Sequence, residues 1–241
     1  MATNVDFDLQ KFRVAEAPCT IYYIPEFISE YEEQMLIKNI LNAPKPKWTQ
    51  LKRRRLQNWG GLPHPKGMIA EIMPQWLSSS VEKVAQLEVF GDNKPNHVLI
   101  NEYLPGQGIM AHTDGPLFYP TVTTISCGSH TVLEFFKPRN NDDLERRSDQ
   151  AESESCDMRT EVVVSLLLEP RSLVIVQDDM YSQMLHSIAE RSVDQVSSEM
   201  KIANRAACAK RFQEDGCFER DTRYSLTIRH VPKTRKFNFK F

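Results

Sequence analysis

The chain has 241 residues, of which 41% are hydrophobic and 26% charged, an ordinary balance for a globular protein. The formal net charge of -2 gives no global field that would select a polyanionic partner, so any basic site must be local. We expect no membrane-spanning helix, because no apolar run approaches roughly 20 residues. We expect no signal peptide, because the first part of the chain carries acids early and lacks an apolar stretch. Five cysteines without a C-x-x-C pair argue against a disulfide framework or a structural zinc site, and favour a reducing intracellular compartment.

The first predicted elements are a strand and a helix. Residues 19–25 are rich in β-branched and aromatic side chains, which favours a strand. Ser29 can cap a helix whose first turn is acidic. The apolar positions of this helix share one face, and they are Leu36, Ile37, Ile40 and Leu41. The pattern ends before Pro44, because the residue before a proline is biased away from helix.

Residues 45–68 have a different composition. Six lysines and arginines up to Arg55 are mixed with Trp48 and Trp59, and two adjacent glycines and two prolines follow, which predicts a surface segment outside the core. Cations for phosphates and flat rings for unstacked bases are what nucleic-acid binding needs. The candidate substrate-binding residues are Trp48, Arg53, Arg54, Arg55 and Trp59. The alternative is a solvated basic turn that its tryptophans anchor to the core.

The rest of the chain is mostly predicted strand. A second helix is expected over residues 74–90, and strands over 97–105, 121–129, 130–138, 161–170, 172–178 and 222–231. This order favours a β sandwich or barrel with flanking helices. The predicted parts are a helical N-terminal extension (1–95), a β core (96–232) with flexible polar insertions at 139–160 and 189–221, and a basic tail (233–241).

A metal site is suggested by His112 and Asp114. In an extended segment, residues two apart project to the same side, so both side chains can face one point. Two imidazoles and one carboxylate suit non-haem Fe(II) and leave positions open for a cosubstrate and O2. Of the six histidines, His186 is the best third ligand, because it follows a predicted strand through a short connection. A short H-x-D motif alone is also common by chance.

The predicted strand near the C-terminus has two distinct faces. Tyr224, Leu226 and Ile228 alternate with a polar set, which is Arg223, Ser225, Thr227 and Arg229. The polar face can be a solvated face of an antiparallel sheet. Alternatively, it lines a barrel interior and binds a carboxylate, for which the planar guanidinium of arginine is suited.

Taken in order, four motifs resemble the AlkB-type dioxygenases. They are the run from Asn101 to Gly106, the His112–Asp114 pair, His186, and the R-x5-R of Arg223 and Arg229. The stretch from residue 41 to residue 68 is similar to the AlkB homologue six branch in particular. The resemblance extends from about Phe12 to Val231, although the 37 residues from His186 to Arg223 exceed the spacing expected for the bacterial type.

The resemblance implies a mainly β fold with flanking helices, a double-stranded β-helix (jelly-roll) core. It implies Fe(II) held by His112, Asp114 and His186. It implies 2-oxoglutarate as cosubstrate, with contacts from Asn101, Tyr103, Arg223, Ser225 and Arg229.

The implied reaction is oxidative dealkylation of nucleic-acid bases, DNA or RNA, which releases succinate, CO2 and formaldehyde. A protein-directed oxygenase, or a nucleic-acid-binding member with little turnover, is the alternative. We further expect a monomer that acts on nucleic acid, not on a membrane, in the cytoplasm and nucleus.

Overall fold

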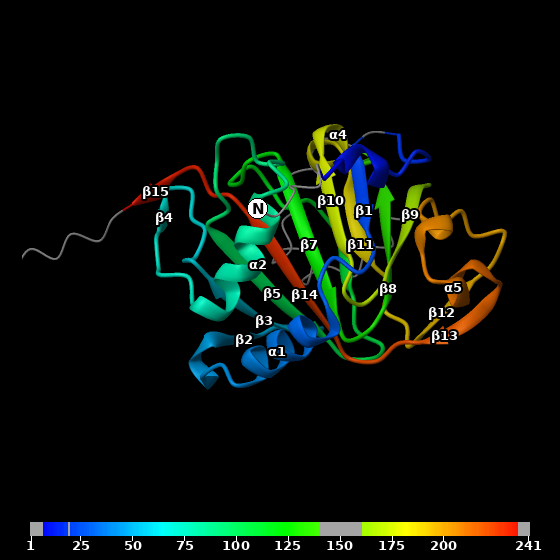
Figure 1. Ribbon diagram of the computed structural model, residues 1–241, viewed down its shortest axis with the longest axis horizontal. Helices are drawn as coiled ribbons and strands as arrows, with labels where there is room; N and C mark the ends of the chain where they lie inside the picture. Colours follow the sequence, from blue (N-terminus) through cyan, green and yellow to red (C-terminus); the bar gives the residue numbers. More distant parts are fainter. Residues whose placement is uncertain (1–6, 19, 140–160, 236–241) are drawn as a thin grey trace, which may run out of the picture.

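The computed structural model describes residues 7–18, 20–139 and 161–235, and it is built around two facing antiparallel sheets (Figure 1). The large sheet has the order β1-β10-β7-β14-β5-β3-β2. Its strands are Ile21–Ile24 (β1), Trp48–Gln50 (β2), Arg55–Trp59 (β3), His97–Tyr103 (β5), Thr121–Cys127 (β7), Leu173–Gln177 (β10) and Arg223–Arg229 (β14). The small sheet, β6-β11-β8-β9, consists of Ile109–His112 (β6), Thr131–Phe136 (β8), Val162–Leu168 (β9) and Leu185–Ile188 (β11). This is the mainly β, jelly-roll architecture that the strand pattern and the resemblance predicted.

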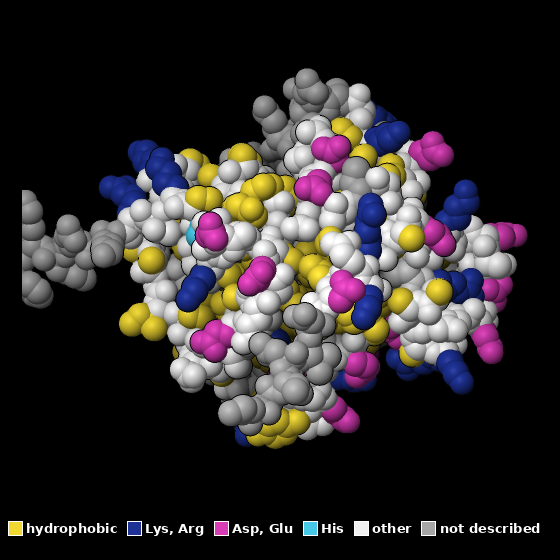
Figure 2. Space-filling model, turned by 45° about the horizontal axis from the view of Figure 1, so that its top comes forward, with side chains coloured by type: hydrophobic (Ala, Val, Ile, Leu, Met, Phe, Trp, Pro, Cys, Tyr) yellow, Lys and Arg dark blue, Asp and Glu magenta, His cyan; other side chains and the backbone are white. Residues whose placement is uncertain are grey.

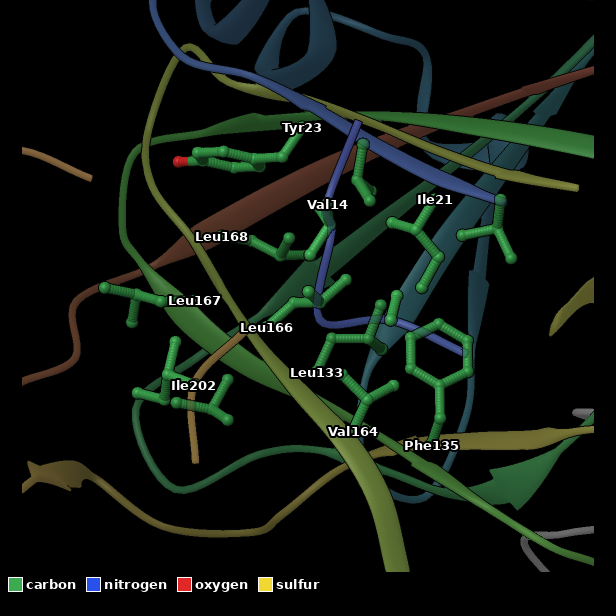
Figure 3. Packing of buried hydrophobic residues seen from close by; sticks show 14 of the residues in the cluster. Val14, Ile21, Tyr23, Leu133, Phe135, Val164, Leu166, Leu167, Leu168 and Ile202 are labelled. Carbon is green, nitrogen blue, oxygen red and sulfur yellow. The ribbon is translucent and has the colours of Figure 1, made fainter. Parts of the chain in front are cut away.

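Two apolar layers hold the sheets in place. Between the sheets, Leu133, Val164 and Leu166 of the small sheet pack with Val14 and Ile21 (Figure 3). On the outer face of the large sheet lie helices α1 (Glu30–Leu41) and α2 (Gln75–Ala85). Their apolar faces cover the outward side chains of the large sheet, among them Tyr224, Leu226 and Ile228. The other face of β14 is thereby directed to the interior of the sandwich.

Helix α1 begins where its sequence predicts. The Ser29 hydroxyl accepts from the backbone N–H of Glu32, and the Glu32 carboxylate accepts from the backbone N–H of Ser29. This reciprocal capping box satisfies two backbone donors that a helix start otherwise leaves unpaired. Helix α2 is shorter than the predicted 74–90, because Gln86 ends it and Glu88 adopts a left-handed φ of 57°.

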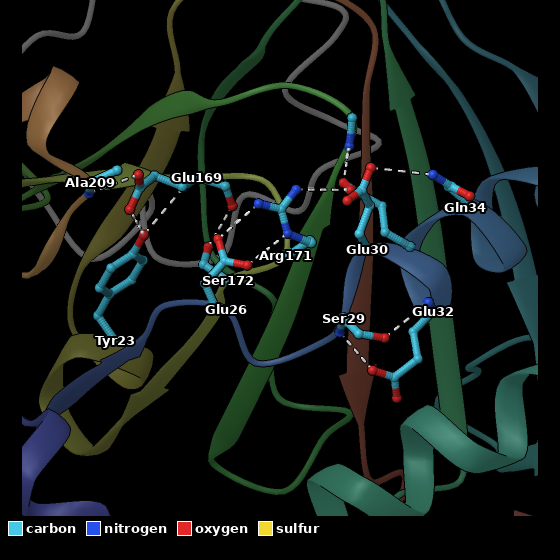
Figure 4. Close-up of polar contacts among 12 residues, drawn as sticks. Tyr23, Glu26, Ser29, Glu30, Glu32, Gln34, Glu169, Arg171, Ser172 and Ala209 are labelled. Carbon is cyan, nitrogen blue, oxygen red and sulfur yellow. Dashed lines mark hydrogen bonds and ion pairs between the residues drawn. The ribbon is translucent and has the colours of Figure 1, made fainter.

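A polar contact ties α1 to the connection between β9 and β10 (Figure 4). Arg171, in a left-handed conformation with φ 65°, forms two hydrogen bonds to Glu26, both at 2.8 Å. Its Nη1 also lies 3.2 Å from Glu33, a buried carboxylate of α1. The nearby Tyr23 hydroxyl donates to Glu169 at 2.8 Å, so the buried carboxylate of Glu169 also has a hydrogen-bond partner.

The prediction that residues 45–68 form a surface segment outside the core is wrong. Strand β3 pairs with β5 in the large sheet, and Gln57 is fully buried. A polar residue can lie there because the Gln57 side chain donates to the carbonyl of Ile40 at 2.9 Å and accepts from Trp59 Nε1. Arg54, in the turn just before this strand, is only 2% exposed. The extension predicted as helical therefore also contributes β1, β2 and β3 to the large sheet.

The segment 189–221, expected to be a flexible insertion, contains regular structure. Strands β12 (Val193–Val196) and β13 (Gly216–Glu219) pair, with short helices η3 (Arg205–Ala207) and α5 (Lys210–Gln213) between them. Asp194 is fully buried and accepts two hydrogen bonds from Arg220, at 2.6 and 2.7 Å. Arg191 Nε lies 2.9 Å and His130 Nε2 3.4 Å from the same carboxylate.

We expect Asp194→Asn to destabilise the protein by about 3–5 kcal/mol at neutral pH, because it leaves buried cations uncompensated. Burial alone would raise the pKa of Asp194, but His130, Arg220 and Arg191 outweigh it and lower this pKa to about 2. A depressed pKa contributes stability that is complete above the unfolded value of about 3.9 and is lost as pH falls through about 2. Urea unfolding between pH 5 and 2 should show a weaker loss of stability in the variant than in wild type. Asp215→Asn, at a surface pair with Arg205, is the control.

The remaining elements are short. They are η1 (Leu9–Phe12), η2 (Lys45–Lys47), α4 (Asp178–Ser182) and a parallel pair formed by β4 (Met68–Ile69) and β15 (Thr234–Arg235). The first residues of the predicted basic tail thus pair with a strand, and residues 236–241 lie outside the described residues, as do 140–160 of the predicted insertion. Within the described ranges, no helix is both long and apolar enough to cross a membrane.

Candidate active site

Two histidines far apart in the chain lie side by side on neighbouring strands of the small sheet. His112 on β6 and His186 on β11 are direct partners in the antiparallel register, and their ring centroids are 4.3 Å apart. Asp114, two residues after His112, places its Oδ2 3.9 Å from His186 Nε2. The pairing of two short strands therefore brings all three predicted ligands together.

The hydrogen bond of His112 determines which of its ring nitrogens is available to bind a metal. Its Nδ1 lies 2.7 Å from the carbonyl oxygen of Met110, and because a carbonyl can only accept, this nitrogen carries the proton. The lone pair is then on Nε2, the form that a metal binds. Burial, together with the charge of His186, lowers the pKa of His112 to about 3, so the ring is neutral at physiological pH.

Asp114 is held as a carboxylate by a buried arginine. Burial would raise the pKa of Asp114, but Arg229, whose Nη1 lies 2.5 Å from Oδ1, outweighs it and lowers that pKa. The other oxygen, Oδ2, is the one nearer to His186. Phe118 covers the face of the Arg229 guanidinium at 3.9 Å, a stacking contact that orients the cation.

These side chains supply a donor set that fits Fe(II), namely two neutral imidazoles and one carboxylate. The 3.9 Å between His186 Nε2 and Asp114 Oδ2 is wider than the roughly 3 Å between adjacent ligand atoms that each lie about 2.1 Å from one metal. Among the residues that the structure describes, no trio of His, Cys, Asp or Glu is already closed around one point. A bound cation would draw the carboxylate and the imidazoles inward by a small side-chain rotation.

A cavity between the two sheets contains these groups and the polar face of β14. Asn101 and Tyr103 reach it from β5, and β14 contributes all four of its polar residues, Arg223, Ser225, Thr227 and Arg229. Register explains the grouping, because Arg223 lies opposite Tyr103 and Ser225 opposite Asn101. Of the two interpretations of this strand, the lining of a barrel interior is therefore the one that the structure supports.

Arg223 is the group in this cavity whose hydrogen bonding is least complete. Its Nη2 donates to Ser126 at 2.9 Å, but its buried Nε and Nη1 have no hydrogen-bond partner among the described residues. Burial lowers the pKa of Arg223 to about 10, so it remains charged at neutral pH. A buried guanidinium with two donors to spare fits the carboxylate of a small acid such as 2-oxoglutarate.

The basic and aromatic residues proposed for substrate binding lie in three different environments. Arg53 forms an ion pair with Glu190, and Arg55 binds Glu102 at 2.6 Å. Trp48 packs under Arg55, and Trp59 contacts both Lys47 and Trp76. Arg54 instead lines the cavity. The five residues therefore do not form one continuous basic surface.

Two residues that hold the site in place were not identified from the sequence. Tyr181 of α4 lines the cavity and donates from its hydroxyl to the carbonyl of Gly115 at 2.8 Å, which fixes the loop after Asp114. Phe118 covers Arg229. Neither belongs to a distinctive motif, because each lies outside the strands of the two sheets, in a segment whose position depends on the pairing of distant strands.

The fold and the cavity define a jelly-roll protein with a His-Asp-His cluster beside a buried arginine. Comparison with known families supports this class, since residues 47–229 match the family described as the 2OG-Fe(II) oxygenase superfamily. A zebrafish (Danio rerio) protein named "Probable RNA/DNA demethylase ALKBH6" is 50% identical over 232 residues, which are 96% of this chain and 94% of that protein. This chain therefore belongs to the 2OG-Fe(II) oxygenase family, and the AlkB-type resemblance is confirmed.

Other matches are more distant. The mouse (Mus musculus) protein named "tRNA (carboxymethyluridine(34)-5-O)-methyltransferase ALKBH8" is 26% identical over 199 residues, 75% of this chain but 26% of that longer protein. The solved structure titled "The structure of OsALKBH1" superposes with a TM-score of 0.51 at 10% identity, over 87% of this chain and 96% of that one, and supports the fold alone. As a member of the family, the protein is an oxidoreductase that uses Fe(II) and 2-oxoglutarate.

Proposed function

We propose that this oxygenase removes alkyl groups from nucleic-acid bases, in DNA or RNA, and forms succinate, CO2 and formaldehyde. The zebrafish relative that bears the name of an RNA/DNA demethylase supports this substrate class, since its similarity extends over nearly the whole of both chains. The observation that carries the proposal is the register pair of His112 and His186 beside Asp114, in one cavity with Arg223.

Each residue of the cavity has a role in this proposal. His112, Asp114 and His186 would hold Fe(II), and Arg223 would bind the far carboxylate of 2-oxoglutarate, with hydrogen bonds from Asn101, Tyr103 and Ser225. Arg229 holds the Asp114 carboxylate in its ionised, oriented form. The iron, with its cosubstrate, supplies the oxidising power for hydroxylation of a substrate C–H bond.

Most of the remaining lining of the cavity is apolar. It comes from both sheets and from α4: Leu99, Ile109, Val122, Leu133, Phe135, Leu168, Val174, Val176, Met180 and Ile188. A low-dielectric wall strengthens the ion pairs inside and protects an oxidising centre from side reactions. When the oxidised carbon is an N-methyl group of a base, the hydroxylated product breaks down to formaldehyde and the bare nitrogen.

The direct test is an assay of succinate and formaldehyde with short single-stranded DNA and RNA oligonucleotides that carry N-methylated bases. We expect both products in equal amounts when Fe(II) and 2-oxoglutarate are present, and no formaldehyde from the unmethylated oligonucleotide of the same sequence. Succinate without formaldehyde from every methylated oligonucleotide would contradict the proposed substrate class. No succinate under any condition would contradict catalysis itself.

One observation favours the alternative of a protein substrate or a binding role with little turnover. Arg53 and Arg55 are paired with carboxylates, which leaves less uncompensated positive charge than the run of basic residues implied. On the face shown in Figure 2, acidic and basic side chains are interspersed, so no single sign dominates there. The same assay, with succinate release stimulated by peptides but not by oligonucleotides, would identify a protein substrate. A monomeric protein of the cytoplasm and nucleus remains part of the proposal.

A further inference from the structure

Arg54 differs from its two arginine neighbours in its place in the fold. Its side chain is 2% exposed and lines the cavity, although the residue belongs to the turn between two strands at the edge of the large sheet. The turn is closed by hydrogen bonds to the Arg54 carbonyl, from the backbone N–H of Leu51 at 2.9 Å and from the Gln50 side chain. The backbone is thus fixed in the geometry that directs this side chain inward.

Inside the cavity, Arg54 contacts Asn101. Arg54 Nε donates to the side chain of Asn101 over 3.0 Å. Because a guanidinium can only donate, the Asn101 atom that faces it must be the carbonyl oxygen, Oδ1. The contact therefore sets which way round the carboxamide lies, and it places the Nδ2 amino group on the other side.

The amino group of Asn101 faces the part of the cavity that would take the cosubstrate. Asn101 is 5% exposed, and no acceptor for its Nδ2 is found among the described residues. The Asn101 Nδ2 atom is not fully buried, so it is accessible from the open space of the cavity. Asn101 lies opposite Ser225 in the strand register, one pair along from the Arg223–Tyr103 end. A donor at this position suits an anionic ligand.

We propose that Arg54 is a positioning residue for 2-oxoglutarate, which acts by holding the Asn101 carboxamide so that its amino group donates to the cosubstrate. This inference rests on the proposed role of Asn101 in cosubstrate binding. It also assigns the three consecutive arginines different roles. Arg53 forms an ion pair with Glu190, Arg55 binds Glu102 on β5, and Arg54 acts on the cosubstrate site rather than on phosphates at the surface.

The test compares Arg54→Met with Arg53→Met, which removes the same charge from the adjacent residue. The dissociation constant of 2-oxoglutarate is measured by titration calorimetry in the absence of O2, with Mn(II) in place of iron. We expect about tenfold weaker binding for Arg54→Met, the size of one hydrogen bond to a charged group, and a change of less than about twofold for Arg53→Met. Equal weakening in both variants would show a general charge effect and overturn the inference.

A double-mutant cycle shows whether Arg54 acts through Asn101. Asn101→Ala alone and Asn101→Ala combined with Arg54→Met should bind 2-oxoglutarate equally weakly, because the second change removes support for a group that is already absent. If the double variant instead binds 2-oxoglutarate more weakly by the product of the two single effects, Arg54 acts independently of Asn101, which contradicts the proposal.

Asn101→Asp is the variant that separates binding from folding. It keeps an acceptor for Arg54 but removes the amino group, so we expect an unchanged melting temperature and binding weakened about tenfold or more. Wild-type affinity in Asn101→Asp would overturn the inference even if Arg54→Met does not fold. If wild-type protein itself does not bind 2-oxoglutarate, the proposed function fails, and that result is distinct from failure at Arg54 alone.

Discussion

Replacement of His112 by alanine is expected to abolish succinate formation and to weaken binding of Fe(II) by more than about 100-fold. Changes to residues that only support a metal ligand already cost about 10–100-fold in affinity, so loss of a ligand should cost more. His112 is buried and neutral, with its Nδ1 proton held by Met110, and alanine provides no substitute donor. Metal content after anaerobic loading, together with succinate release, measures the effect.

The matched control is His64→Ala. His64 is exposed in a loop, where its Nδ1 accepts from the backbone N–H of Lys66 at 3.0 Å, and it does not line the cavity. We expect this variant to bind iron and to form succinate as wild type does. Iron content in His112→Ala equal to that of wild type would mean that the metal is held elsewhere.

Arg223→Met is expected to weaken 2-oxoglutarate binding by about 100-fold, since truncation of one partner of a buried, hydrogen-bonded charge pair costs at least 2–5 kcal/mol. The same variant should melt about 2–4 °C higher than wild type when no ligand is present, the change that about 1 kcal/mol produces in a chain of this size. Burial lowers the pKa of Arg223 to about 10, so the ligand-free fold bears the cost of a charged group with two unused donors. Methionine of similar length fills the space without that cost.

Two measurements check this prediction. Calorimetric titration with 2-oxoglutarate gives the affinity, and thermal unfolding with and without the cosubstrate gives the stability. High 2-oxoglutarate should restore part of the turnover of Arg223→Met, because the iron ligands are intact. A variant that is less stable than wild type without ligand and binds 2-oxoglutarate normally would show that Arg223 is a structural residue only.

The sequence alone was sufficient for features that depend on near neighbours. Helix α1 was predicted from Ser29 and its acidic first turn, and the capping box is present. The alternation along β14 was predicted from its residues, and its apolar face packs under the helices while its polar face lines the cavity. Such patterns are local because side-chain periodicity and capping are set by residues within one turn or strand.

The tertiary structure decided which distant segments meet. Strands β6 and β11 are four residues each, too short for a clear alternating pattern, so their pairing was not predictable although it aligns His112 with His186. Arg54 was expected at the surface with Arg53, because a local pattern of cations is usually solvated. Its burial depends on a partner 47 positions away in the chain, Asn101. From residue types alone, a charged side chain is expected at the surface, because its burial costs free energy. Only the completed fold supplies the hydrogen bonds that offset this cost at one position.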